Sequence, residues 1–95
     1  MIIHFEDKHT RAIFNGESTG RFSDAIEEAA LRKMQMLHAA TSIASLQMMP
    51  GLHCKKMGGK LRMFWSIRVN NQYRILFTWA EPPPEASRVW LTDPH

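Results

Sequence analysis

The chain has 95 residues, of which 44% are hydrophobic and 22% are charged, and its formal net charge is +3. This length and composition predict one small globular domain with a single core and exclude an intrinsically disordered chain. No apolar run approaches the roughly 20 residues that a membrane span needs, and the charged N-terminus lacks the apolar stretch of a signal peptide. The single cysteine, Cys54, excludes an internal disulfide and a multi-cysteine zinc site. We therefore expect a protein of the reduced cytoplasm, with no membrane partner and no metal or other cofactor.

The first half of the chain predicts one strand followed by helices. Residues 1–5 are rich in β-forming side chains and predict a short first strand, and residues 7–15 can hold one helical turn. Ser23 and Asp24 can both cap the longest helix. Its apolar side chains recur at helical spacing on one face, and Glu27 is among the polar residues expected elsewhere. The apolar set is Ile26, Ala30, Met34, Leu37 and Thr41.

A second short helix is predicted from the Thr41-Ser42 cap to Met48, because Pro50-Gly51 ends it. The second half of the chain reads as consecutive strands joined by turns. Helices that precede a run of strands favour the α+β class. We expect an N-terminal strand and two helices packed on a mainly antiparallel sheet of four to five strands, in one domain that spans residues 1–95.

The pairing of the two central strands can be chosen from their apolar face, because a slip of one residue turns a strand over. A three-residue loop at residues 70–72 sets Ile67 against Ile75. A two-residue loop would instead set Ile67 against an arginine. The same choice places Arg68 directly across from Arg74, where two positive charges repel unless an anion or a carboxylate lies between them.

The strand before these two is paired by the same rule. A turn at Gly58-Gly59 pairs Cys54 with Trp65 and His53 with Ser66, which keeps Cys54 on the core side. One face of the sheet is then apolar and the other is basic. The basic face is expected to hold His53, Lys55, Ser66, Arg68 and Arg74.

The C-terminal strand is expected to return along the strand before it and to bring Asp93 close to Arg74. His95 then reaches the same edge of the sheet, near His53. The pattern leaves open which set of this strand faces the core, either Arg88 and Trp90 or Val89 and Leu91. The convergence on Arg74 holds for both alternatives.

Cleavage of RNA without a metal needs a base for the 2′-OH, an acid for the leaving 5′-oxygen and cations at the phosphate. His53 and His95 can transfer protons, Asp93 can orient a histidine, and Arg74 can bind the phosphate together with Lys55, Lys56 and Arg68. Simpler interpretations stand beside this one. A strand histidine and adjacent lysines are often solvated, strand arginines can bind a partner's carboxylates, and a terminal Asp-Pro-His can be a frayed tail.

Several segments resemble the HigB-type toxins of bacterial toxin–antitoxin modules, within the wider RelE/ParE superfamily. The matches extend from residues 1–5 to the Asp93-x-His95 terminus and span essentially the whole chain. The most specific match is Trp65-Ser66-Ile67-Arg68-Val69-Asn70, followed by Tyr73-Arg74-Ile75. The resemblance implies a RelE-like fold and a ribosome-dependent mRNA interferase, an endoribonuclease that needs no metal and leaves a 2′,3′-cyclic phosphate.

The resemblance also implies which residues act. The family's catalytic histidine after the second helix matches His53, its strand arginine matches Arg74, and its C-terminal aspartate and histidine match Asp93 and His95. The implied partners are a HigA-type helix-turn-helix antitoxin, the ribosome and mRNA, with operator DNA bound only through the antitoxin complex.

One position departs from the family pattern. Pro94 stands where the family usually has a tyrosine, which would be a stacking or proton-handling group. Phe64 or Trp90 is then the candidate for stacking on a base.

Two other functions remain open. The chain could be a RelE-fold toxin that is not a nuclease, as gyrase-inhibiting ParE relatives are, or an RNA-binding module that acts only through its antitoxin complex. Mapping mRNA ends after expression separates these from a nuclease, because neither alternative produces codon-positioned cuts.

Overall fold

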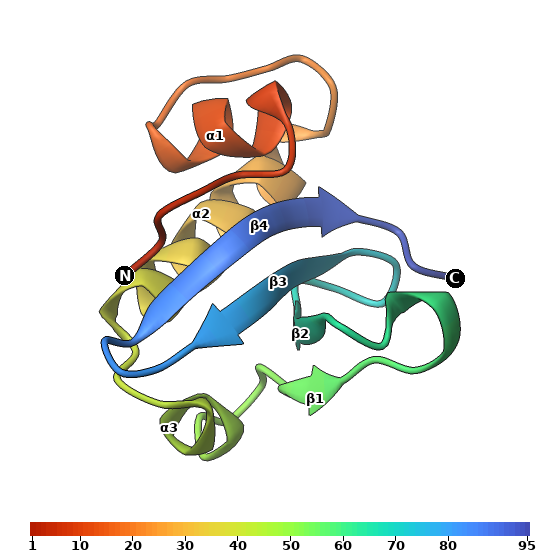
Figure 1. Ribbon diagram of the computed structural model, residues 1–95. Coiled ribbons are helices and arrows are strands. Elements are labelled where there is room, and N and C mark those ends of the chain that lie inside the picture. Colours follow the sequence, from red (N-terminus) through yellow and green to blue (C-terminus); the bar gives the residue numbers. More distant parts are fainter.

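The computed structural model describes residues 1–95 and consists of three helices and one four-stranded antiparallel sheet (Figure 1). The strands lie in the order β1-β2-β3-β4. This confirms the predicted α+β class and the antiparallel sheet. No helix has the length and apolar character that crossing a membrane requires. The elements are α1 (Lys8–Phe14), α2 (Asp24–Ala39), α3 (Ile43–Gln47), β1 (Lys55–Lys56), the 3-10 turn η1 (Gly59–Leu61), β2 (Trp65–Arg68), β3 (Arg74–Ala80) and β4 (Glu85–Thr92).

The helix starts follow the predicted caps. The hydroxyl of Ser23 accepts a hydrogen bond from the backbone N–H of Ile26 at 3.3 Å, and Ser42 caps α3 in the same way. These contacts satisfy N–H groups that have no partner within the helix. Thr41 is exposed, contrary to prediction, because α2 already ends at Ala39.

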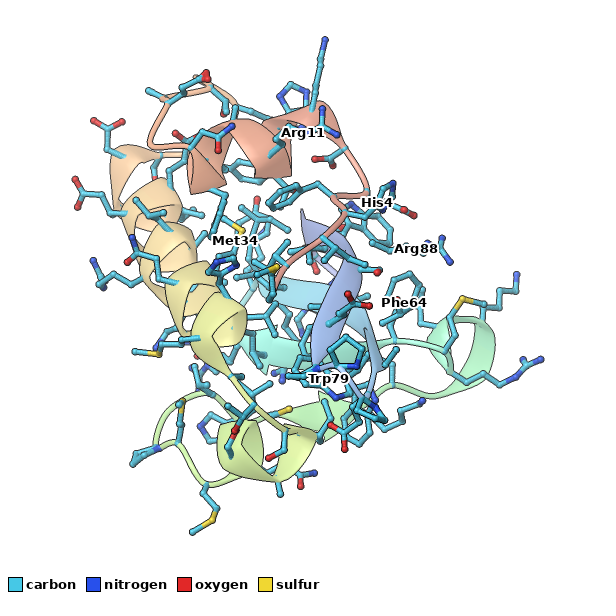
Figure 2. All side chains as sticks on the ribbon, turned by 60° about the vertical axis from the view of Figure 1, so that its left-hand side comes forward. His4, Arg11, Met34, Phe64, Trp79 and Arg88 are labelled. Carbon is cyan, nitrogen blue, oxygen red and sulfur yellow. The ribbon has the colours of Figure 1, made fainter.

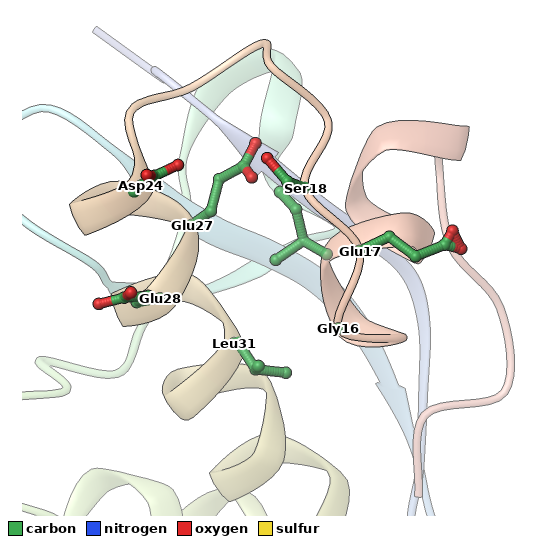
Figure 3. A pocket seen from close by; sticks show the side chains of 8 residues that line it. Gly16, Glu17, Ser18, Asp24, Glu27, Glu28 and Leu31 are labelled. Atoms are coloured by element: carbon green, nitrogen blue, oxygen red, sulfur yellow. The ribbon is translucent and has the colours of Figure 1, made fainter.

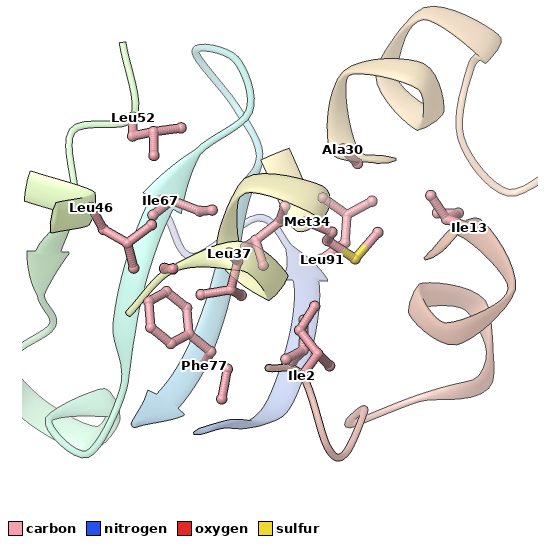
Figure 4. Packing of buried hydrophobic residues seen from close by; sticks show 14 residues of the cluster. Ile2, Ile13, Ala30, Met34, Leu37, Leu46, Leu52, Ile67, Phe77 and Leu91 are labelled. Atoms are coloured by element: carbon pink, nitrogen blue, oxygen red, sulfur yellow. The ribbon is translucent and has the colours of Figure 1, made fainter. Parts of the chain in front are cut away.

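The main core lies between α2 and one face of the sheet (Figure 4). Met34 and Leu37 of α2 are fully buried, and so are Ile67, Ile75 and Phe77 of the central strands. The apolar side chains that recur at helical spacing in α2 therefore pack against those that alternate along β2 and β3. This layer fixes the orientation of β2 and β3, and so fixes which of their side chains point away from the helices.

Glu27 is buried, contrary to prediction, because the connection between α1 and α2 folds over it (Figure 3). The backbone N–H of Thr19 donates to its carboxylate at 3.2 Å, and the Thr19 hydroxyl donates to the other oxygen. Burial raises the pKa of Glu27, but the hydrogen bonds from Thr19, Phe22 and Ser18 outweigh burial and leave it lowered. Glu27 is therefore ionised near neutral pH, and its carboxylate accepts the hydrogen bonds that hold the connection between α1 and α2. Asp24, Glu28 and Glu17 surround it in an acidic hollow.

The register of the central strands is as predicted. Ile67 pairs with Ile75, and Arg68 pairs with Arg74 across the three-residue loop. In β4, Val89 and Leu91 face the core and are almost fully buried, which settles the face that the sequence left open.

The first predicted strand is only partly formed. Residues 1–5 run beside β4 in Figure 1, but they make two isolated parallel bridges, Ile2 with Ala86 and Phe5 with Val89. Arg88, which lies between the two bridges, adopts a positive φ of 52°, and the pairing of β4 with β3 shifts its register at the same place.

The predicted register of β1 is wrong by two residues. Lys55 pairs with Ser66 and Lys56 with Trp65, in place of His53 and Cys54. The connection to β2 is not a tight turn at the glycines, since it contains the turn η1 and is closed by a bond from Met57 N–H to the Phe64 carbonyl at 2.9 Å. The apolar-face rule fixes only which side a residue faces, and a shift of two preserves that side.

A second, smaller apolar layer lies on the other face of the sheet. Leu76 alternates with the core residues of β3 and is fully buried on this face. Phe64 exposes only 3% of its surface, and Trp90 is the strand partner of Leu76. The Phe64 ring packs against Trp90 at a centroid distance of 6.2 Å. The Arg88 guanidinium lies 4.8 Å from the same ring (Figure 2). The expectation that Phe64 stacks on a base is therefore wrong, since neighbouring side chains already cover its ring.

Candidate functional site

A cleft of about 550 Å³ lies beside β1 and β2, under the C-terminal tail. Three permanently charged cations line it, Lys55, Arg68 and Arg74, and no acidic side chain does. A polyanion is attracted to such a surface, whereas the acidic hollow near Glu27 repels it. The complete lining is His53, Lys55, Met57, Arg68, Asn70, Asn71, Arg74, Pro94 and His95.

Arg74 is the most firmly held of these residues. Its Nε–H donates to the hydroxyl of Ser66 at 2.8 Å, and its Nη2 donates to the backbone carbonyl of His53 at 2.6 Å. Burial lowers the pKa of Arg74, and the nearby charge of Arg68 lowers it further, while Cys54 acts in the opposite direction. An arginine stays protonated near neutral pH even so. The cleft thus contains a partly desolvated cation in a defined orientation.

Arg68 lies directly across from Arg74 and is held by the loop between β2 and β3. Its Nε–H donates to the carbonyl of Asn70 at 3.3 Å, and its Nη2 donates to the side-chain oxygen of Asn71. The side chain of Asn70 accepts from the backbone N–H of Tyr73 at 2.7 Å, which stabilises the loop. No carboxylate separates the two arginines, so an incoming anion would relieve their repulsion.

His53 precedes β1 and has a left-handed backbone with φ of 46°. Few non-glycine residues adopt this conformation, because the Cβ crowds the backbone. Two bonds hold the segment: Arg74 binds the His53 carbonyl, and the backbone N–H of Arg68 donates to the carbonyl of Leu52 at 2.7 Å. The imidazole is exposed and lines the cleft.

The C-terminal tail brings His95 to the cleft and holds it through Asp93. One carboxylate oxygen of Asp93 lies 2.7 Å from His95 Nδ1 and accepts from the His95 backbone N–H at 3.0 Å. Gln72 donates to the other oxygen at 3.3 Å. The hydrogen bond from the His95 side chain is the largest of several effects that lower the pKa of Asp93. Because Nδ1 is engaged, the Nε2 atom of His95 is the one available for proton transfer.

The structure brings together five of the predicted positions and separates others. His53, Lys55, Arg68 and Arg74 share the cleft with His95, as the sequence indicated. Asp93 lies behind His95 and borders a neighbouring hollow.

Lys56 does not line the cleft, because adjacent strand residues face opposite sides. Its ammonium lies 5.3 Å from the centroid of the Trp65 ring. Lys56 was predicted to bind the phosphate together with Lys55, Arg68 and Arg74, and the structure places it outside their cleft.

Sequence reasoning missed Asn70 and Asn71 as cleft residues and Ser66 as a partner of Arg74. The predicted register already contained a signal for the asparagines, since it placed them in the short loop that joins the strands of Arg68 and Arg74. It also placed Ser66 on the basic face without a role.

The remaining histidines have structural contacts. His38 Nδ1 accepts from the backbone N–H of Ile2 at 3.1 Å, and His4 Nδ1 accepts from that of Arg88 at 3.3 Å. No group of three or more histidine, cysteine, aspartate or glutamate side chains is arranged to hold a metal ion.

Comparison with known proteins places these features in a family. Residues 3–95 match the model of the HigB-like toxins, described as the RelE-like toxin of the type II toxin–antitoxin system HigB. A Vibrio cholerae protein named toxin HigB-1 is 34% identical over an alignment that covers 100% of this chain and 98% of the relative. An uncharacterized protein of Haemophilus influenzae is 28% identical, with 97% of this chain and 89% of the relative covered. The chain belongs to the HigB-like family of RelE-like toxins of type II toxin–antitoxin systems, and such a toxin implies a cognate antitoxin.

Proposed function

We propose that the protein is a ribosome-dependent mRNA endoribonuclease whose active site is the cleft between β1, β2 and the C-terminal tail. The observation that carries the proposal is the meeting of two histidines and three cations around one cleft without a carboxylate in its lining. Membership of the HigB-like toxins supports it as well. Cleavage by attack of the neighbouring hydroxyl requires this set of groups.

In the proposed reaction, His53 and His95 are the two proton-transfer groups. One removes the proton of the 2′-OH, and the O2′ atom attacks the adjacent phosphorus. The bond from phosphorus to the 5′-oxygen breaks, and the other histidine protonates that oxygen. The products are a 2′,3′-cyclic phosphate and a free 5′-OH. Asp93 orients His95 through Nδ1, while Arg68, Arg74 and Lys55 stabilise the charge that develops on the phosphate.

The proposed partners follow from this reaction. The ribosome presents the mRNA in extended form, and a HigA-type helix-turn-helix antitoxin neutralises the toxin and carries the complex to operator DNA. Lys55 lies exposed at the start of β1, where it can contact RNA phosphates. No phenylalanine, tyrosine or tryptophan ring lines the cleft, so we expect contacts with the RNA backbone to dominate over base stacking.

The proposal is tested by expressing the toxin and mapping mRNA ends. We expect growth arrest, cuts positioned by codon on translated messages and 2′,3′-cyclic phosphate termini. His53→Ala and His95→Ala should each relieve the arrest. His9→Ala is the matched control, because His9 lies on α1 and lines a different hollow.

Three results would contradict the proposal. Undiminished toxicity of both site variants would exclude the proposed residues. Growth arrest with DNA damage and intact messages would instead indicate a target such as gyrase. RNA binding that weakens with salt and produces no new RNA ends would indicate an RNA-binding module.

A further inference from the structure

Ser66 is a buried hydroxyl beneath the cleft that the proposed reaction does not use. It has no exposed surface and does not line the cleft. Its side chain accepts a hydrogen bond from Arg74 Nε at 2.8 Å. Since a buried polar group is costly without a partner, this contact determines where the Arg74 guanidinium can lie.

The guanidinium of Arg74 has two usable edges, and the protein occupies one of them. The Nε–H and one Nη2–H form the side edge, which binds Ser66 and the carbonyl of His53. The outer edge is formed by Nη1 and the second N–H of Nη2, and no protein group binds it. Such an edge matches two phosphoryl oxygens in a planar, bidentate contact.

We propose that Ser66 is a positioning residue, which locks the side edge of Arg74 so that the outer edge faces the scissile phosphate while His53 stays in place. The inference rests on the proposed nuclease function and adds a residue to that site. Without Ser66, nothing holds the Nε–H, and the charge of Arg68 across the strand pair pushes the guanidinium away. The Arg74 guanidinium would then no longer be held where it can bind both the phosphate and the His53 carbonyl.

The first test is made on the free protein and does not depend on nuclease activity. In ¹⁵N-edited NMR spectra, the Nε–H of Arg74 should exchange slowly with solvent, and its signal is assigned by its absence from Arg74→Lys. Ser66→Ala should abolish this protection, whereas Ser45→Ala should not change it. Ser45 is a suitable control because it is a half-buried serine of α3 with its own side-chain bond, to the Ser42 carbonyl at 2.7 Å.

The second test is a double-mutant cycle in ribosome-bound mRNA cleavage. Ser66→Ala should lower the single-turnover rate about 10- to 100-fold without weakening ribosome binding, because a hydrogen bond to a charged group is lost. Arg74→Lys keeps the charge but cannot make all these contacts at once. If Ser66 acts only through Arg74, Ser66→Ala should have no additional effect in the Arg74→Lys background.

The outcomes separate the inference from the nuclease proposal. Retained Nε–H protection in Ser66→Ala, or additive losses of rate in the cycle, would overturn the role of Ser66. A wild-type protein that leaves RNA uncut would refute the nuclease proposal, while the NMR result still reports on the geometry of Arg74. If Ser66→Ala does not fold, Ser66→Cys replaces it, since a thiol is nearly isosteric and a weak acceptor.

Discussion

The two sides of the cleft are held in different ways. On the strand side, Arg74 is half-buried and bonded to a fully buried hydroxyl and to a backbone carbonyl. On the tail side, the side chains of His95 and Asp93 are 65% and 38% exposed, and they are bonded mainly to each other. Only Gln72 links the Asp93 carboxylate to the rest of the protein.

In the proposed reaction, this difference separates the groups that stabilise charge from the groups that transfer protons. The cations must be oriented before RNA arrives, because preorganised groups need no rearrangement during the reaction. Their position is therefore built into the sheet and depends on the fold. A proton-transfer group can lie on an exposed tail, provided that one bond orients its ring. Substitutions on the tail side should change mainly the rate, with at most a slight effect on stability, whereas those on the strand side should change rate and stability together.

The largest expected effect is on the rate, at the tail. His95→Ala should slow single-turnover cleavage of ribosome-bound mRNA by about 10²–10⁴-fold, because a proton-transfer group is lost. Its melting temperature should stay that of the wild type, since exposed positions contribute little stability. A clear loss of stability would show that the tail is part of the folded core and would remove the distinction between the two sides.

A smaller effect, on stability, is expected on the strand side. Arg74→Ala leaves the buried Ser66 hydroxyl and the His53 carbonyl without their partner, so we expect a loss of about 1–3 kcal/mol in the free energy of unfolding. Denaturant titration measures this loss. Arg32→Ala, at an exposed arginine of α2, should stay within about 0.5 kcal/mol of the wild type. Equal stability of the two variants would indicate that the Arg74 contacts do not support the fold.

The hydrogen bond that links the tail to the sheet should have a smaller effect on the cleavage rate than His95. Gln72→Ala removes one exposed hydrogen bond of 3.3 Å to Asp93, which we expect to slow cleavage about 2- to 10-fold without changing the melting temperature. The control is Gln35→Ala, at an exposed glutamine of α2. A rate loss as large as that of His95→Ala would mean that Gln72 has a direct role at the RNA.

The smallest effect concerns pH. The pKa of Asp93 is lowered from its ordinary value of 3.8, first of all by the hydrogen bond from the His95 side chain. The stability that ionised Asp93 adds to the folded protein is therefore fully present above pH 3.8. It is lost as the pH falls through the lower pKa that Asp93 has in the folded state. Melting curves at a series of acidic pH values should show a slightly smaller acid-induced decrease for Asp93→Asn than for the wild type. Identical curves would show that the pair adds nothing to stability.

Much of the strand side could be predicted from alternation. The choice of register put Arg68 across from Arg74 and placed Ser66 on their face, because only one pairing keeps the other face apolar. Alternation also contained the information that Lys56 points away from Lys55. The convergence of His53 and His95 could be predicted as well, because hairpin geometry brings the end of β4 back to the start of β3.

The errors concern segments that fold over other segments. Phe64 and Glu27 were expected to be accessible, but Trp90 and Arg88 of β4 pack against the ring of Phe64, and the connection before α2 covers Glu27. Strand and helix periods describe the faces of single elements and contain no information about which loop covers them. The two-residue error at Lys55 has a similar origin, since the path of the η1 connection determines the register.

The backbone of His53 has a consequence for how active toxin can be produced and preserved. A histidine at φ of 46° costs about 1 kcal/mol relative to an ordinary conformation, and glycine would remove that cost. Under the proposed function, a mutation to glycine at this position would therefore yield an inactive protein that folds at least as well as the active one. If His53 is the proton-transfer group that we propose, selection for stability alone would favour its loss, and selection for activity would keep a histidine there.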